Sequence, residues 1–308
     1  MPAMFLQLKR LKMLFAFSQF LLKLSNLKNN NYYLIMYGEQ SYLIENLLSD
    51  EMCLDIFTKA KDGIKWSKMY NRGSEVPRLV AIQYEKNTYS DIPIYRHPVD
   101  EQPDGEEFNE LTLMIKNEIE KKLGQKFNHC LIQYYENGSA NIGEHSDKTL
   151  DIEFGTNIVN YSIGATRTFI LKDKDKIKEK QRIKLPHNSL FVMDWDTNRK
   201  WLHAIHPDNR PECEKTDDEL DYDGSRISYT FRTISTFITK DNKLYGKGAK
   251  VKTKEELNKS IDDTSRDDTS DDSLDMLKAF SKENHESNFD YNLYKNGFDS
   301  LNLKTINI

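Results

Sequence analysis

The sequence predicts an α+β protein whose core is a double-stranded β-helix (jelly roll) buttressed by N-terminal helices. Two segments with helical spacing come first, over residues 49–61 and 106–123, and short strands separated by turns follow from residue 130. Many short strands after two helices favour two facing sheets with helices packed on one of them. A chain of 308 residues, 11% of them aromatic, can bury one large core.

Each predicted helix has a start or stop that the sequence marks. The first begins at a capping Ser49 or Asp50 and ends before Gly63. The second ends at Gly124. Apolar side chains recur at helical spacing along the second helix, at Phe108, Leu111, Met114, Ile115, Ile119 and Leu123. We expect both helices to pack against the sheet.

Eight segments have the composition of strands. They cover residues 76–84, 130–135, 156–163, 167–171, 181–185, 189–195, 201–205 and 226–238. The proline-rich stretch 92–103 is predicted to be a loop. The charged stretch 172–180 is expected to be a solvated hairpin tip, and the acid-rich stretch 207–225 a loop in solvent.

Changes in composition divide the chain into four parts. A basic apolar extension covers residues 1–38, and the main domain covers 39–245. Residues 246–272 are rich in Asp, Ser and Thr and are predicted to be an acidic disordered linker. Residues 273–308 contain enough aromatic side chains to dock on the main domain or on a partner protein.

The extension has five Lys or Arg residues and no acid, as a mitochondrial presequence would, although it has fewer Arg and Ser residues than is usual. The alternatives are a poorly ordered extension or a true start at Met36. We expect an intracellular protein in the nucleus or cytoplasm, or in mitochondria if the extension is a presequence.

Composition excludes several classes of protein. Mean hydropathy is −0.73, and no apolar run is long enough to span a bilayer as a helix. The cysteines Cys53, Cys130 and Cys213 are odd in number and widely spaced, which argues against a disulfide framework or a zinc site. Net charge is −5 overall and −7 over residues 39–245, so we expect no broad electrostatic grip on duplex phosphates.

The stretch from Ile142 to Asp151 contains a His-x-Asp pair, His145 and Asp147. In extended backbone, alternate side chains leave on the same side, so this imidazole and this carboxylate would reach one point. A second His would complete a 2-His-1-carboxylate facial triad, which binds iron and leaves coordination positions open. The pair alone is weak evidence, because most His-x-Asp pairs lie in surface turns.

We predict that the second His is His203. It lies in a short apolar segment, with Trp201 and Ile205 at the period-two spacing of a strand. His187 and His206 are the competing candidates, the first at the start of a strand and the second beside a proline.

An alternating strand downstream carries Arg226 and Arg232 on one face. A guanidinium presents a planar fork that binds a carboxylate through two hydrogen bonds, as a dicarboxylate such as 2-oxoglutarate would require. For either arginine alone, a surface ion pair is the commoner role.

At these residues the chain resembles the iron(II)- and 2-oxoglutarate-dependent dioxygenases typified by AlkB, the nucleic-acid dealkylation enzymes. The resemblance covers about Val76 to Ile238. The segments that carry it follow the family's order: Pro77–Arg78, Phe127–Tyr135, Gly138, Ile142–Asp147, Ser162–Arg167, Leu185–Leu190, Thr197–His203 and Arg226–Arg232. This set is highly specific for the family and much less specific for the substrate.

The resemblance implies a role for each of these residues. His145, Asp147 and His203 would bind Fe(II), and Arg226 would hold the distal carboxylate of 2-oxoglutarate with help from the Tyr135 hydroxyl. Dioxygen is the other co-substrate. The implied reaction hydroxylates a substrate carbon and yields succinate and carbon dioxide. An N-methyl group treated in this way leaves as formaldehyde.

The resemblance also places Arg232 near the iron-side end of the co-substrate. Two positions depart from the family pattern, because Gln133 and Ser228 stand where many members have Asn. Both could contact the co-substrate, so the hydrogen bonds there are expected to differ from those of the family.

Four residues are candidate substrate contacts: Lys65, Trp66, Arg72 and Arg78. They interleave positive charge with an aromatic ring, which suits phosphate neutralisation and base stacking, and in the resembled family this side of the barrel covers the target base. The alternative is that Trp66 belongs to the core and that the charges form a solvated rim.

The resemblance therefore predicts a monomeric enzyme without a transmembrane segment that demethylates alkylated bases in DNA or RNA and contacts nucleic acid through a local patch. Two alternatives stay open. One is an oxygenase of the same type acting on a protein or a small molecule, and the other is a binding module that has lost activity.

Overall fold

The computed structural model describes residues 36–301 except 72, 100–102, 177 and 260–269. Nearly all of the extension predicted over 1–38 lies outside the described residues. The same holds for the predicted substrate contact Arg72 and for the middle of the linker predicted over 246–272.

The larger sheet has eight strands in the order β1-β2-β13-β10-β15-β8-β5-β7. In this order the strands are Met36–Tyr37, Ser41–Ile44, Ser189–Met193, Ile158–Gly164, Arg226–Arg232, His129–Tyr135, Leu79–Tyr84 and Gly105–Glu107. Neighbouring strands are antiparallel except β5 and β7. Every residue of β8, β13 and β15 is buried, so these strands form the centre of the domain.

The second sheet has four strands in the order β12-β11-β14-β9. They are Lys180–Leu185, Arg167–Asp173, Trp201–Ile205 and Ile142–His145. A buried apolar cluster joins the sheets, with Phe169 and Leu171 from the small sheet and Phe191 and Met193 from the large one. The α+β content predicted from the sequence is confirmed, and this two-sheet core is consistent with a jelly roll.

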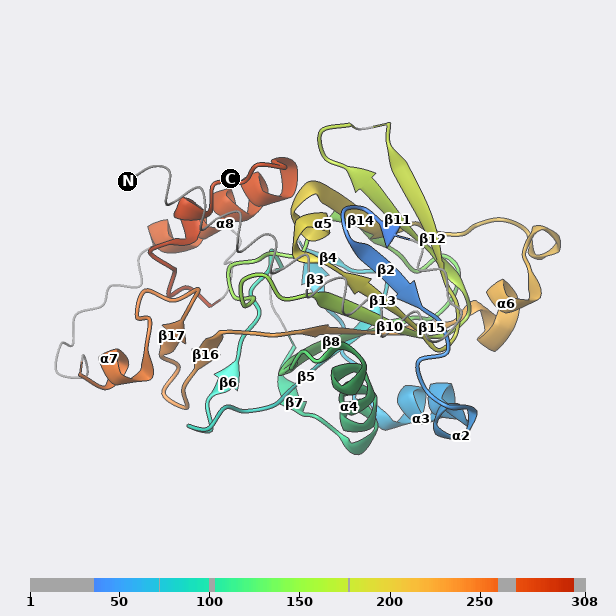
Figure 1. The fold of residues 1–308 in the computed structure, drawn as a ribbon, viewed down its shortest axis with the longest axis horizontal. Coiled ribbons are helices and arrows are strands. Elements are labelled where there is room, and N and C mark those ends of the chain that lie inside the picture. Colours follow the sequence, from blue (N-terminus) through green and yellow to red (C-terminus); the bar gives the residue numbers. More distant parts are fainter. Residues whose placement is uncertain (1–35, 72, 100–102, 177, 260–269, 302–308) are drawn as a thin grey trace, which may run out of the picture. The chain divides into compact units, whose positions relative to one another are not determined.

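Helices pack on the outer face of the large sheet (Figure 1). They are α2 (Asp50–Cys53), α3 (Ile56–Gly63) and α4 (Glu110–Leu123). A second apolar cluster holds them there, in which Phe57 of α3 and Ile115 of α4 join buried residues of the strands such as Tyr229. The helices therefore buttress the part of the sheet that contains β15, the strand of Arg226 and Arg232.

Both predicted helices differ from the structure at one point. The helix predicted over 49–61 is two helices, because Asp55 has a left-handed backbone with φ of 55°. The helix predicted from 106 starts at Glu110, since Asn109 caps it and accepts a hydrogen bond from the Thr112 amide at 2.8 Å. Residues Gly105–Glu107 pair with β5 instead.

Two predicted strands end earlier than the sequence suggested. Asp194 caps α5 (Trp195–Lys200) and so ends β13 at Met193. The segment 226–238 divides into β15 and β16 (Thr236–Ile238). The remaining elements are β3 (Tyr70–Asn71), β4 (Ser74–Glu75), β6 (Ile92–Pro93), β17 (Leu244–Gly246), η1 (Glu212–Glu214), α6 (Asp217–Leu220) and η2 (Asp221–Gly224).

The C-terminal part contains α7 (Lys254–Lys259), α8 (Ser270–His285) and η4 (Tyr291–Tyr294). A third apolar cluster packs Met276, Phe280 and Phe289 against Leu150, three residues after Asp147. The described residues 246–259, assigned to the linker from sequence, hold the end of β17 and α7.

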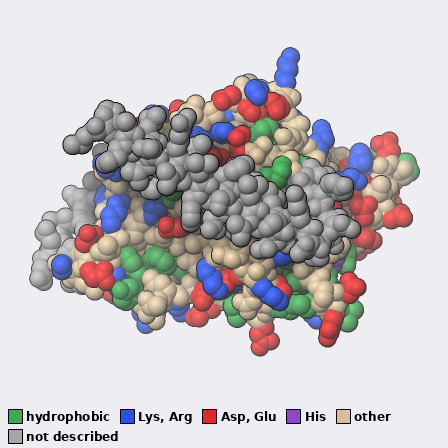
Figure 2. All heavy atoms as spheres, viewed as in Figure 1, with side chains coloured by type: hydrophobic (Ala, Val, Ile, Leu, Met, Phe, Trp, Pro, Cys, Tyr) green, Lys and Arg blue, Asp and Glu red, His purple; other side chains and the backbone are tan. Residues whose placement is uncertain are grey.

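The visible surface has mixed charge. Figure 2 shows Lys and Arg side chains interspersed with Asp and Glu over the described part of the face in view. Among the described residues, no helix has both the length and the apolar character needed to cross a bilayer.

Candidate metal and co-substrate site

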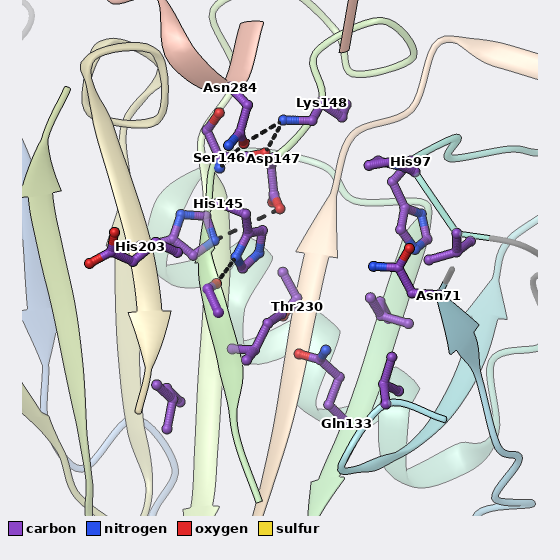
Figure 3. Close-up of a pocket in the computed structure, with 18 of the residues that line it drawn as sticks. Asn71, His97, Gln133, His145, Ser146, Asp147, Lys148, His203, Thr230 and Asn284 are labelled. Atoms are coloured by element: carbon purple, nitrogen blue, oxygen red, sulfur yellow. Dashed lines mark hydrogen bonds and ion pairs between the residues drawn. The ribbon is translucent and has the colours of Figure 1, made fainter. Parts of the chain in front are cut away.

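A cavity of about 530 Å³ lies between the two sheets. Its walls include β8 and β15 of the large sheet, β9 and β14 of the small sheet, and residues of α8 (Figure 3). The cavity contains the His-x-Asp pair.

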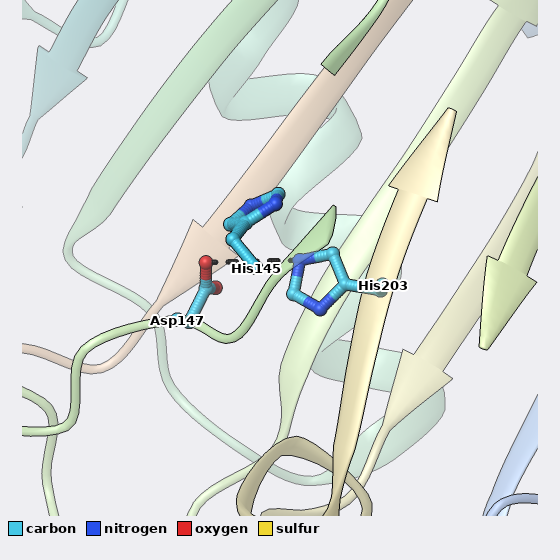
Figure 4. Close-up of side chains that lie close together, drawn as sticks. All are labelled: His145, Asp147 and His203. Carbon is cyan, nitrogen blue, oxygen red and sulfur yellow. Dashed lines mark ion pairs between the residues drawn. The ribbon is translucent and has the colours of Figure 1, made fainter. Parts of the chain in front are cut away.

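Strand pairing brings the predicted metal ligands together. His145 ends β9, and the antiparallel pairing of β9 with β14 places it directly opposite His203. Asp147 follows in the next loop, and ligand atoms of all three side chains lie within 4.8 Å of one another (Figure 4). Across the described parts of the chain, this is the one group of three His, Cys, Asp or Glu side chains arranged to hold a metal ion.

The two imidazoles are suited to metal binding. The Nδ1 atom of His145 lies 2.8 Å from the carbonyl oxygen of Gly143, which fixes a proton on Nδ1 and leaves Nε2 with a free lone pair. Burial lowers the pKa of His145 to about 4. Burial and the neighbouring His145 also hold the pKa of His203 well below its usual value. Both rings are therefore neutral near pH 7, as a metal ligand requires.

Asp147 is held as a carboxylate by Arg232. Burial alone would raise the pKa of Asp147, but the Arg232 guanidinium and the two imidazoles outweigh burial and lower it. Arg232 donates from Nε and Nη2 to Oδ2 of Asp147 at 3.0 and 2.8 Å. The other oxygen, Oδ1, lies 3.9 Å from Nε2 of His203. One oxygen is thus occupied by Arg232, and the other faces the histidines.

Asn198 and Tyr95 complete this arrangement, and the sequence did not single out either. The Asn198 side chain exchanges two hydrogen bonds of 2.9 Å with the backbone of Asp147. The Tyr95 ring lies under the guanidinium of Arg232, with 4.1 Å between the ring centroid and Cζ. Both contacts limit the movement of the charged pair.

Arg226 is fully buried and has no carboxylate bonded to it among the described residues. Its Nη2 donates to Asn160 Oδ1 at 2.8 Å and to Ser162 Oγ at 2.7 Å. Within the part of the chain that the structure describes, its Nε and Nη1 have no hydrogen-bond partner. Burial lowers the pKa of Arg226 to about 10. A buried guanidinium with unfilled donors fits the carboxylate of a dicarboxylic co-substrate.

The other predicted co-substrate contacts surround Arg226. The Tyr135 ring lies 5.2 Å from the guanidinium carbon, and its hydroxyl is 3.5 Å from Gln133 Oε1. Ser228 is buried on the same strand as Arg226 and accepts a hydrogen bond from Asn160. Gln133 and Tyr135 line the cavity, and Ser228 is bonded to Asn160, which lines it too.

Asn160 is a functional candidate that the sequence analysis missed. It lines the cavity, and besides accepting from Arg226 it donates to Ser228 and Thr230. Two polar residues, Asn160 and Ser162, alternate within the otherwise apolar strand β10. That alternation could have indicated a polar contact at this position.

The predicted substrate residues divide into two groups. Arg78 lines the cavity, and its Nη1 donates to the carbonyl oxygen of Asn141 at 3.0 Å. The structure does not bring Lys65 or Trp66 to the cavity. Lys65 is exposed, while Trp66 packs against the helix-side cluster with its ring 5.3 Å from that of Tyr134. That placement corresponds to the core alternative considered for Trp66.

The competing histidines lie outside the triad. His187 accepts a hydrogen bond from the Gly164 amide and lies 3.1 Å from the sulfur of Cys53. His206 is exposed, and its carbonyl oxygen accepts from Arg167. Neither belongs to the group of three side chains that could hold a metal.

The profile of the 2OG-Fe(II) oxygenase superfamily matches residues 40–232, which is more than half of the chain. The chain belongs to this superfamily. Its cofactor is Fe(II), with 2-oxoglutarate and dioxygen as co-substrates. The unpartnered donors of Arg226 and the His145, Asp147 and His203 group fit this cofactor set.

Relatives of known name support the resemblance to the AlkB group. Alpha-ketoglutarate-dependent dioxygenase alkB homolog 3 of Bos taurus is 29% identical over 194 residues, 60% of each chain. DNA oxidative demethylase ALKBH2 of the same species is 34% identical over 98 residues, 30% of this chain and 35% of that relative. The chain thus spans only part of these relatives. A solved structure of OsALKBH1 has a TM-score of 0.45 at 15% identity, covering 66% of this chain and 99% of that one.

Proposed function

We propose that this protein is a dioxygenase that oxidatively demethylates alkylated bases in DNA or RNA, with release of formaldehyde, succinate and carbon dioxide. The observation that carries the oxygenase reaction is the triad in the cavity together with the buried Arg226, which is hydrogen-bonded to the cavity-lining Asn160 and, among the described residues, keeps two donor nitrogens without a partner. The likeness to relatives named as a DNA oxidative demethylase and an alkB homolog supports the nucleic-acid substrate.

His145, Asp147 and His203 would hold Fe(II), and the two sheets would form the double-stranded β-helix that positions them. When bound, Fe(II) supplies the activation of dioxygen, which is coupled to the decarboxylation of 2-oxoglutarate. Arg226 would bind and orient the distal carboxylate of the co-substrate. Arg232 would keep Asp147 ionised and fixed in direction, so that one of its oxygens faces the histidines. Gln133, Ser228 and Tyr135 would complete the co-substrate contacts.

The substrate side of the proposal depends on Arg78 and the cavity. A methylated base reaches a buried site only if it leaves its stack or already lies in a single strand. Arg78 would contact the nucleotide at the cavity wall, and the exposed Lys65 would contact it outside the cavity. Arg72, which lies outside the described residues, stays a predicted contact, whereas the packing of Trp66 favours the core role. A monomer in the nucleus or cytoplasm, or in mitochondria, is part of the same proposal.

A same-type oxygenase acting on a protein or small molecule is the second candidate, because the net charge of −7 over residues 39–245 favours no polyanion. An assay separates the two. The protein is incubated in air with Fe(II), 2-oxoglutarate and single-stranded oligonucleotides that carry 1-methyladenine or 3-methylcytosine, and base mass is followed.

We expect the loss of one methyl mass with the wild-type protein and no loss with His145→Ala, because that variant lacks one of the three ligands. Succinate formation without a mass change would contradict the nucleic-acid substrate and favour the second candidate. If protein that is shown to bind iron forms neither succinate nor the demethylated base, the result would support an inactive binding module.

A further inference from the structure

Helix α8 forms part of the cavity wall, although it lies beyond residue 232, where the superfamily match ends. Its residues that line the cavity are Leu277, Phe280, Ser281, Asn284 and His285. Of these, Asn284 is in direct contact with the loop that carries Asp147 (Figure 3). A polar side chain at this wall is therefore a candidate contact for whatever occupies the cavity.

Hydrogen bonds define the orientation of the Asn284 amide. Its Oδ1 accepts from the Ser146 backbone amide at 3.0 Å and from the Lys148 ammonium at 2.8 Å. Both partners can only donate, so the oxygen must face them, and the Nδ2 group takes the other side of the amide. Within the described part of the chain Nδ2 makes no hydrogen bond, which leaves its N–H groups available at the cavity wall.

The wall that holds Asn284 is fixed by its neighbours. Glu283, which is buried, accepts from the Thr149 amide at 3.0 Å and from the Tyr294 hydroxyl at 2.6 Å. Met276 and Phe280 anchor the same helix in the third apolar cluster. A donor on a rigid element recognises a ligand atom more selectively than a donor on a mobile loop.

The charge beside Asn284 favours an electron-rich ligand atom. Lys148 is 4% exposed, and its ammonium donates to the Ser146 carbonyl and to Asn284, which are neutral, while the carboxylates of Glu283 and Asp147 interact with it through their charge. A buried positive charge attracts an oxygen that carries negative or partial negative charge. The N–H donors of Asn284 require the same kind of atom, an acceptor.

We propose that Asn284 is a substrate contact that donates from Nδ2 to an oxygen acceptor of the methylated nucleotide. The acceptor is a carbonyl oxygen of the base or an oxygen of the phosphate. This assignment rests on the proposed function, and it makes α8 a determinant of substrate selection outside the residues that match the superfamily.

Asn284→Asp is the decisive variant, because Asp keeps an acceptor for Ser146 and Lys148 but has no N–H to donate. We expect the KM for the oligonucleotide to rise about tenfold, as for the loss of one hydrogen bond near charge. Co(II) affinity and 2-oxoglutarate affinity, measured by titration, should stay at the wild-type values. Asn292→Ala, an exposed asparagine in η4, is the matched control and should leave every value unchanged.

The two sources of the acceptor give different patterns. A base carbonyl predicts a larger KM for 3-methylcytosine, which has a ring carbonyl, and no change for 1-methyladenine, which has none. A phosphate oxygen predicts the same rise for both. The contact would be overturned if Asn284→Asp kept the wild-type KM values while Asn284→Ala bound Co(II) more weakly. Asn284 would then only support the loop that carries Asp147. Absence of demethylation by the wild-type protein would instead overturn the proposed function, and the substrate role of Asn284 with it.

Discussion

Strand β15 carries two buried arginines six residues apart, and they lie in opposite electrostatic settings. Arg232 forms two hydrogen bonds to the carboxylate of Asp147 and lies over the ring of Tyr95. Arg226 donates to two neutral oxygens, of Asn160 and Ser162, and two of its donor nitrogens have no partner among the described residues. Its pKa is lowered by burial, whereas Asp147 raises that of Arg232 against the effect of burial.

This electrostatic difference indicates that Arg232 supports Asp147, whereas Arg226 is suited to binding a ligand. A buried ion pair such as Arg232 with Asp147 is complete within the protein, and removing one partner leaves an uncompensated charge. A buried cation without a carboxylate is costly in the empty protein and gains most when an anionic ligand arrives. We infer that the same residue type on the same strand orients a proposed metal ligand at one end and would bind the proposed co-substrate at the other.

Arg226→Met is expected to give the largest effect on binding. It should reduce 2-oxoglutarate affinity by on the order of a thousandfold, since a buried charge-assisted contact is lost. The free energy of unfolding of the ligand-free protein should stay level or increase, because an unpaired buried charge is removed. Isothermal titration and urea unfolding measure the two quantities, with the exposed Arg210→Met as control. Unchanged 2-oxoglutarate affinity would contradict the assignment.

Arg232→Met should have the opposite effect on stability. It leaves the Asp147 carboxylate buried without its partner, so the free energy of unfolding should fall by about 3–5 kcal/mol. Co(II) affinity should fall as well, because Asp147 is no longer held toward the histidines. Urea unfolding and the Co(II) absorption spectrum report these changes. A stability equal to that of Arg226→Met would show that the two arginines are not in different settings.

Asn160→Asp sharpens the comparison by giving Arg226 a carboxylate of its own. The new ion pair would occupy donors that are otherwise available, so 2-oxoglutarate affinity should fall by about tenfold while thermal stability increases. Asn160→Ser, which keeps a neutral acceptor, is the matched variant and should bind the co-substrate more tightly than Asn160→Asp. The reverse order of affinities would rule out competition for Arg226.

Lys247 is, like Arg226, a cation whose pKa is lowered by burial. Its ammonium donates to the carbonyl oxygens of Thr149 and Ile152, and burial lowers its pKa from 10.5 to about 8. Between these values the unfolded chain binds more protons than the folded one, so stability increases with pH. Below about pH 8 Lys247 is protonated in both the folded and the unfolded chain, so its contribution to the free energy of unfolding no longer changes with pH.

The gain from Lys247 should be about 1 kcal/mol between about pH 8 and pH 9. Urea unfolding at both pH values measures it, and the gain should be smaller by this amount in Lys247→Met. If the free energy of unfolding of the variant depended on pH as that of the wild-type protein does, burial would not be lowering the pKa of Lys247.

Much of the fold could be predicted because periodicity determines it. The strands with alternating or continuous apolar residues, such as Trp201–Ile205, were predicted at their observed bounds. The break at Asp55 was not, because a left-handed residue inside an amphipathic pattern leaves the pattern intact. The extra strand at Gly105–Glu107 depends on pairing with β5, which no local pattern encodes.

The site divides in the same way. His145, Asp147, His203 and Arg226 could be predicted because each belongs to a short motif with its own spacing. Asn160, Asn198 and Asn284 could not, since their roles come from partners between 51 and 138 residues away in the chain. For Trp66 the local pattern allowed two interpretations, because an aromatic ring among basic residues suits a substrate contact and a core position equally well.

The most direct test of the central claim is the balance of products from the wild-type protein. Formaldehyde and succinate are measured together during incubation in air with Fe(II), 2-oxoglutarate and a 3-methylcytosine oligonucleotide, with the unmethylated oligonucleotide as control. The account predicts equal amounts of the two products with the methylated strand and no formaldehyde with the control. Succinate at the same rate with both strands, and no formaldehyde from either, would contradict it.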